Sequence, residues 1–251
     1  MLAALLVALP VQSQALPRCA GPVEISNAHL LRVEKNGAII LTDGRAVHLE
    51  GIRLPAGAQD HAPQAFIDQS LAAIAALARS GALTLTAVAP KEDRYDRVRV
   101  QAFVRDRWIQ SDLLARGLAR VAISPDRVEC AAELFAVEAK ARAAQAGVWS
   151  SSAYAVRNPF NLSLDTGTFQ VVEGKVLNAS VKSGRVYLNF GPDWRTDFTV
   201  TIDPQDKKHF RDAGVDPTSY AGQTIRVRGW VQSSNGPEIE VPNPQGVEVV
   251  Q

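Results

Sequence analysis

One short stretch of the sequence places side chains where they could do acid–base chemistry. His48 and Glu50 lie two residues apart in the extended segment 47–56, so their side chains share one face of a strand. With Arg97 they could form an acid–base site, because a histidine beside a carboxylate exchanges protons near neutral pH. Two residues on one strand are weak evidence for catalysis. We therefore favour a polar barrel mouth, in which a salt bridge links this pair to Arg53 or Arg97.

A second stretch combines arginines with aromatic rings in one hairpin. Guanidinium groups and rings together can bind phosphates and stack on bases. Aspartates are interleaved with the arginines, which favours a solvated, internally neutralised hairpin instead. The arginines are Arg94, Arg97, Arg99, Arg105 and Arg107, the aromatic residues are Tyr95, Phe103 and Trp108, and the aspartates are Asp93, Asp96 and Asp106.

The second half of the chain has its own aromatic residues. Trp194, in the loop 191–195, is the best candidate for an exposed ligand contact, and core packing explains Phe198 and Trp230 equally well. Residues 151–251 hold 10 basic and 11 acidic side chains. Because this balance does not favour a polyanion, we expect a structural or partner-binding role here before nucleic-acid binding.

Composition and cysteine count limit the remaining classes. The 251 residues carry a formal net charge of +1, which argues against a strongly basic, non-specific nucleic-acid binder. Two cysteines and four histidines form no zinc pattern, and the sequence has neither a Walker loop nor a Gly-x-Ser-x-Gly elbow. An even cysteine count in an exported chain favours a disulfide, here Cys19–Cys130, from the mature N-terminus to the start of a helix.

The N-terminus predicts export. Residues 2–9 are almost wholly Leu, Ala and Val, and Ser13 and Ala15 are small residues at the spacing of a signal-peptidase site. We expect residues 1–15 to be a signal peptide and the mature protein to be periplasmic or secreted. The apolar run is too short to span a bilayer.

The elements that position these residues are predicted by periodicity. Residues 22–50 form a β-meander with turns at Asn36-Gly37 and Asp43-Gly44. A helix is expected over 64–80, because its apolar residues recur at helical spacing, and Gly81 ends it. Further elements are expected as strands over 83–88 and 98–104, a short helix over 113–116 and a long helix over 127–146.

A change in composition predicts a second domain. The serine run at 150–152 and Pro159 indicate a linker over 151–164. Residues 165–251 then read as five strands with a helical turn after the third, which is the order of an OB-like barrel. The fold class is therefore mainly β with α (α+β), with domains at 16–150 and 165–251.

Residues from about 22 to 150 resemble the staphylococcal nuclease family. The resemblance rests on five segments, at residues 41–49, 51–55, 93–97, 113–121 and 138–149. It implies a five-stranded OB-type barrel with three helices. Active members cleave phosphodiesters of DNA and RNA with Ca²⁺ held by two aspartates, a glutamate that positions or activates water, and two arginines on the phosphate.

Carried over position by position, that catalytic set is degenerate. The first metal aspartate falls on Gly37, the first arginine on His48, the second metal aspartate on Arg53 and the glutamate on Ala56. The second arginine is retained as Arg97, and the family's nucleotide-contacting tyrosine as Tyr95. A guanidinium at position 53 repels a divalent cation, and Ca²⁺ needs carboxylate oxygens that these positions lack.

Two hypotheses follow from the resemblance. The first is a non-catalytic module, without cofactor or metal, that binds a protein, a nucleic acid or a phosphorylated ligand; its ligand contacts would be His48, Glu50, Arg53, Tyr95, Arg97 and Trp194. The alternative is a divergent Ca²⁺-dependent nuclease with a shifted carboxylate set such as Asp43, Glu50 and Asp60. Carboxylates that converge near Arg97 would favour the nuclease.

Overall fold

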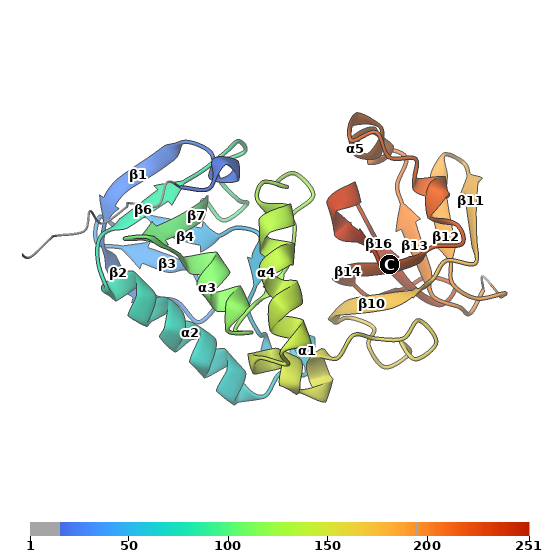
Figure 1. Ribbon diagram of the computed structural model, residues 1–251, viewed down its shortest axis with the longest axis horizontal. Helices are drawn as coiled ribbons and strands as arrows, with labels where there is room; N and C mark the ends of the chain where they lie inside the picture. The colour runs from blue at the N-terminus through green and yellow to red at the C-terminus, as the bar shows by residue number, and fades with distance from the viewer. Residues whose placement is uncertain (1–15, 194, 251) are drawn as a thin grey trace, which may run out of the picture.

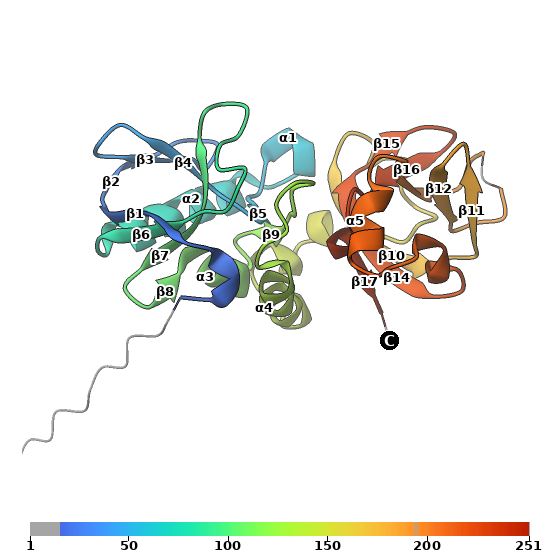
Figure 2. The same ribbon diagram turned by 90° about the horizontal axis from the view of Figure 1, so that it is seen from above.

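The protein forms two β-barrels that lie side by side, with a helix of the first barrel between them (Figures 1 and 2). The computed structural model describes residues 16–193 and 195–250. The predicted signal peptide and the candidate Trp194 lie outside the described residues. Within the described part of the chain, no helix has the length and apolar character needed to cross a membrane.

The first barrel is a continuous path of paired strands. β1 (Val23–Ala28) pairs with β6 (Leu83–Thr86), β6 with β7 (Val98–Val104), β7 with β4 (Ala46–Leu49), β4 with β3 (Ile39–Leu41), and β3 with β2 (Leu30–Val33). The β4–β7 pair is parallel and the others are antiparallel. Only His29 separates β1 from β2, so the path returns to where it began. This is the OB-type order expected from the sequence.

Three helices of seven residues or more complete this domain, as expected. α2 (Gln64–Arg79) buries Ile74 and Leu77 against the barrel. α3 (Ile109–Ala115) begins four residues before the predicted position, because the buried amide of Gln110 already bonds Ala102 N and Val100 O. The remaining small elements of the domain are α1 (Gly57–Asp60), β8 (Arg107–Trp108), and the pair β5 (Ile52–Arg53) and β9 (Arg120–Val121).

The predicted disulfide is confirmed. Cys19, in a 3-10 turn (Arg18–Ala20), is bonded to Cys130, which directly precedes α4 (Ala131–Ala143). The prediction that this helix starts at Arg127 was wrong. Arg127 lies instead in a turn, where its guanidinium donates to Glu129 and to the carbonyl of Pro90.

The strands of the second barrel are paired in the same order as those of the first. Antiparallel pairs join β10 (Phe169–Lys175) to β14 (Thr224–Trp230), β11 (Asn178–Lys182) to β12 (Arg185–Asn189), and β12 to β13 (Thr199–Ile202). β13 runs parallel to β16 (Pro237–Glu240), which pairs with β15 (Gln232–Ser233). Since β10 leads into β11 and β14 into β15, the path closes. The last strand is β17 (Val247–Val249), and α5 (Lys207–Asp212) follows β13.

The segment 151–164, predicted as a linker, packs against both barrels. Tyr154 and Leu162 are each only 1% exposed, and Tyr154 sits beside Phe66 of α2. Leu162 belongs to the core of the second barrel. The domain boundaries themselves stay a prediction.

Candidate functional site

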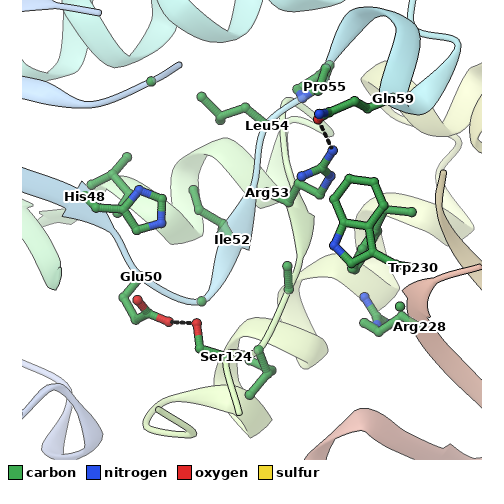
Figure 3. Close-up of a pocket in the computed structure, with 18 of the residues that line it drawn as sticks. His48, Glu50, Ile52, Arg53, Leu54, Pro55, Gln59, Ser124, Arg228 and Trp230 are labelled. Atoms are coloured by element: carbon green, nitrogen blue, oxygen red, sulfur yellow. Dashed lines mark hydrogen bonds between the residues drawn. The ribbon is translucent and has the colours of Figure 1, made fainter. Parts of the chain in front are cut away.

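A cleft with a volume of about 860 Å³ separates the two barrels on the side where most of the predicted site residues lie. The first barrel contributes the stretch from His48 to Gly57, and the second contributes Trp230 and the segment after β16. Figure 3 shows His48 and Glu50 at one end and Arg53 beside Trp230 at the other. Of the predicted site residues, Gly37, His48, Glu50, Arg53 and Ala56 line the cleft.

Gly37 lies in a turn that a longer residue would strain. Its φ is +84°, and a Cβ built there would stand 2.3 Å from Cδ1 of Leu54. The amide of Gly37 donates to the carbonyl of Glu34 and so closes the turn. A longer side chain at this position would strain the backbone and would require the end of Leu54 to move.

Arg53 links the two barrels. Its Nη2 lies 3.2 Å from Oδ1 of Asp60 and donates to Gln59. Its guanidinium carbon lies 4.6 Å from the ring centroid of Trp230 and 5.4 Å from that of Phe169, both in the second barrel. Cation–π contacts of this kind strengthen when they are shielded from water. The guanidinium of Arg53 thus contributes to the interface between the barrels.

Asp60 is the buried anion that holds this arrangement. Its side chain is fully buried, and its Oδ2 accepts from the amide of Ala56 at 3.1 Å. The same oxygen lies 3.1 Å from Nη2 of Arg120, whose pKa is lowered chiefly by burial. The carboxylate of Asp60 therefore forms ion pairs with two guanidinium groups, those of Arg53 and Arg120. Because one negative charge faces two positive charges, this cluster carries a net positive charge.

Glu50 pairs with Arg99, which corrects the salt bridge expected with Arg53 or Arg97. Arg99 Nε donates to Glu50 Oε2 at 2.8 Å, and Ser124 Oγ donates to Oε1 at 2.6 Å (Figure 3). Arg99 also holds both oxygens of Asp126. Glu50 is only 2% exposed, and both of its carboxylate oxygens accept hydrogen bonds. It therefore has little capacity left to bind a metal or to transfer a proton.

His48 is half-buried beside this ion pair. Its pKa is lowered from 6.5, mainly because burial penalises the imidazolium; Arg97 and Arg99 lower it further, while Glu50 and Asp93 oppose the shift. The ring is therefore neutral at pH 7, where it can donate from one nitrogen and accept at the other.

Tyr95 and Arg97 lie outside the cleft lining. Arg97 Nε donates to Asp93 Oδ2 at 2.8 Å, and its guanidinium lies 5.2 Å from the ring of Tyr95. The pKa of Asp93 is lowered by its bonds to Arg97 and to backbone amides, although burial opposes them. Tyr95 is 62% exposed and also contacts Arg94. The arginine retained from the catalytic set is thus neutralised within its own loop.

A second ion-pair network joins the barrels, and sequence reasoning missed it. Arg228 of β14 donates to Glu138 of α4 at 2.7 Å and to Glu248 of β17 at 2.6 Å, and Glu138 accepts from the amide of Val121. Glu138 is fully buried and Arg228 is 7% exposed. A signal did exist, because Glu138 falls at helical spacing between Leu134 and Ala141 on the buried stripe of α4.

The carboxylates of the shifted set do not converge. Asp43 is exposed and bound to Arg45, Glu50 is bound to Arg99, and Asp60 is bound to Arg53 and Arg120. Among the described residues, two groups of three side chains are close enough together to hold a metal ion. The first consists of the disulfide-bonded Cys19 and Cys130 with Glu133, and the second of Asp203, Asp206 and Glu240 in the second barrel. Neither group contains Asp43, Glu50 or Asp60, and the second group reaches the cleft through Glu240. The side chains of Gly37, Arg53 and Ala56 offer no oxygen ligand for Ca²⁺.

The model of the staphylococcal nuclease homologue family matches residues 46–151, so the chain carries a domain of this family there. The match covers β4 through α4 and includes His48, Arg53 and Ala56. No curated protein matches the chain.

Proposed function

We propose that this protein is an exported, non-catalytic member of the nuclease family that binds an anionic, phosphorylated ligand in the cleft between its barrels. The observation that carries the proposal is Arg53. It stands where the family has a metal carboxylate, and it is fixed by Asp60 and by the ring of Trp230.

The loss of metal chemistry rests on three positions. Gly37 and Ala56 carry no carboxylate, and Arg53 is a cation; a side chain at position 37 would also be strained by its φ of +84°. Loss of a metal or of one electrostatic contact normally costs several kcal/mol of transition-state stabilisation, about 3 kcal/mol for a single oxyanion donor. The combined substitutions therefore favour binding over hydrolysis.

The charge of the cleft supports an anionic ligand. The charged residues that line the cleft are the cations Lys35, Arg53 and Arg228 and the acids Glu50 and Glu240. Glu50 and Arg228 are bound in ion pairs of their own, and Arg53 shares Asp60 with the buried Arg120. Lys35 is exposed and forms no ion pair with a described residue, so it is the cation most open to an anionic ligand. Neutral His48 can add a hydrogen bond. Trp230 is 40% exposed at the same cleft, so a ligand's planar group could contact its ring.

Export is supported by the confirmed disulfide together with the apolar N-terminal sequence. Disulfides persist in oxidising compartments such as the periplasm and the cell exterior. Cleavage of residues 1–15 would show as a mature N-terminus at Leu16 in the mass spectrum of the protein recovered from a cell's exported fraction. An unprocessed chain in the cytosolic fraction would contradict export.

A divergent nuclease is the second candidate, and the retained pair of Tyr95 and Arg97 favours it. Plasmid DNA and RNA incubated with the protein and Ca²⁺, Mg²⁺ or Mn²⁺ separate the two functions. We expect no metal-dependent cleavage. Cleavage that disappears in Arg97→Ala would overturn the non-catalytic proposal and establish the nuclease.

Ligand binding is tested with inorganic pyrophosphate as the probe, by isothermal titration calorimetry. We expect saturable binding by the native protein, with weaker binding by Lys35→Ala and by Arg53→Gln. Lys175→Ala, which removes a lysine of the second barrel outside the cleft, is the matched control. Equal binding by all four proteins would contradict the cleft site.

A further inference from the structure

The second barrel has a groove of its own, remote from the cleft. It has a volume of about 380 Å³ and lies over β11, β12 and β13, closed at one side by the turn Ser234-Asn235. β11 and β12 form the end of the second barrel that points away from the first in both views (Figures 1 and 2). A ligand there would therefore not touch the cleft.

Strand alternation makes this face almost wholly polar. On β12, Val186 and Leu188 are buried in the core, so Arg185, Tyr187 and Asn189 point outward. The neighbouring strands add hydroxyl and amide groups from Asn178, Ser180 and Thr199. Tyr187 is the aromatic residue of the groove, and it pairs with Ser180 on one side and Thr201 on the other.

The floor of the groove is built from buried polar side chains. Glu238 is 8% exposed and Thr199 is 6% exposed. Glu238 Oε1 accepts from the hydroxyl of Thr201 at 3.1 Å, and its Oε2 has no hydrogen-bond partner among the described residues. A carboxylate oxygen that lines a groove and has no protein partner is a strong acceptor for a ligand hydroxyl.

The charges of the groove do not suit a nucleic acid. Arg185 is paired with Asp203 and lies 3.8 Å from Glu238, so Lys182 is the cation of the groove lining that forms no ion pair with a described residue. Single-stranded nucleic acids are bound by continuous positive grooves with several stacking rings. A groove with one ring, one unpaired lysine and a carboxylate offers little of the positive charge and stacking that a phosphodiester chain needs.

We infer that this groove is a binding site for an uncharged oligosaccharide. Sugar hydroxyls both donate and accept, which matches a lining of amide, hydroxyl and carboxylate groups, and the apolar face of a sugar ring packs on an aromatic ring such as Tyr187. OB-type barrels present this same sheet face to extended polymeric ligands. The site is independent of the cleft and of the anionic ligand proposed there.

The test is calorimetric titration of the full chain with cellohexaose and N-acetylchitohexaose, and with an oligothymidylate as the nucleic-acid arm. We expect one of the oligosaccharides to bind and Tyr187→Ala to weaken it about tenfold, the effect of losing one aromatic contact. Phe160→Ala removes an exposed ring outside both sites and should leave the affinity unchanged.

A second variant protects the test from a folding defect at Tyr187. Ser180 is exposed, so Ser180→Trp should fill the groove and abolish oligosaccharide binding while the protein stays folded by circular dichroism. Failure of both oligosaccharides to bind, binding unaffected by either variant, or tighter binding of the oligothymidylate would each overturn the proposal.

Discussion

In the first barrel, Glu50, Arg53 and Arg97 are each bound to an oppositely charged neighbour, whereas in the second barrel Ser180 and Lys182 face solvent over an open groove. The two barrels nevertheless share one order of strand pairing, including the parallel pair β4–β7 in one and β13–β16 in the other. The same topology therefore supports a face used for docking and a face left free, so topology alone does not assign function.

The difference follows from what covers each barrel. The first carries α2, α3 and α4 and a disulfide, and its mouth lies against β14 and Trp230 of the second. The described helices of the second barrel are all short; they include α5 and the 3-10 helix Pro217–Tyr220, which contacts β11 and β12. On β11, Asn178 and the residues from Ser180 to Lys182 stay exposed, and Ser180 and Lys182 line the groove.

The largest expected effect comes from breaking the buried network that joins the barrels. Arg228→Leu leaves Glu138 fully buried without its closest cation, and removing one partner of a buried pair costs about 4 kcal/mol of unfolding free energy. Urea denaturation measures this loss. Arg228→Leu combined with Glu138→Gln should recover part of it, and a single-variant loss below ~1 kcal/mol would show that the barrels are not coupled through this network.

Removing the disulfide should cost somewhat less and should affect the barrels unequally. Cys19 and Cys130 are 111 residues apart. Loss of a disulfide typically lowers the unfolding free energy by about 3 kcal/mol. The change is Cys19→Ser with Cys130→Ser. Amide hydrogen exchange should accelerate in β1 and α4 and stay slow in β12, and an equal acceleration in both barrels would contradict this asymmetry.

A smaller effect is expected from pH, through His48. Because the folded state lowers the pKa of His48 below 6.5, the unfolded chain takes up the proton first as the pH falls. Stability should therefore decrease as the pH drops through about 6.5, and the urea midpoint should fall less between pH 7 and pH 5 in His48→Gln. His29→Gln, at an exposed position, is the control, and an unchanged pH slope in His48→Gln would refute the assignment.

The smallest effect is expected when the residues typical of the family are introduced into the first barrel. We expect such a variant to gain no nuclease activity. Arg53→Asp with Ala56→Glu supplies two carboxylates, but Gly37 is still packed against Leu54, and the new carboxylate at position 53 would face the carboxylate of Asp60. Plasmid cleavage with Ca²⁺ is the measurement. Metal-dependent cleavage by this double variant would show that the site is only two substitutions from activity.

Sequence reasoning reached most of the fold and only part of the site. The strands, the three helices and the disulfide followed from local patterns such as Asn36-Gly37 and the stripe of α2. The start of α3 was missed because the long-range bonds of Gln110 determine it. The partner of Glu50 was also missed, because the sequence offered several arginines and only the β4–β7 pairing brings Arg99 beside it.

The sequence by itself predicted that the family's carboxylates are absent, because residue type at a matched position can be read directly from the sequence. It also indicated the succession of strands and helices along the chain, since periodicity and turn residues are local, whereas the barrel of the first domain was expected from the family resemblance. Only the tertiary structure decided what the replacements do. Arg53 became an interface residue because Trp230 and Phe169, from the second barrel, fold over it, and contacts between distant segments leave no local pattern in the sequence.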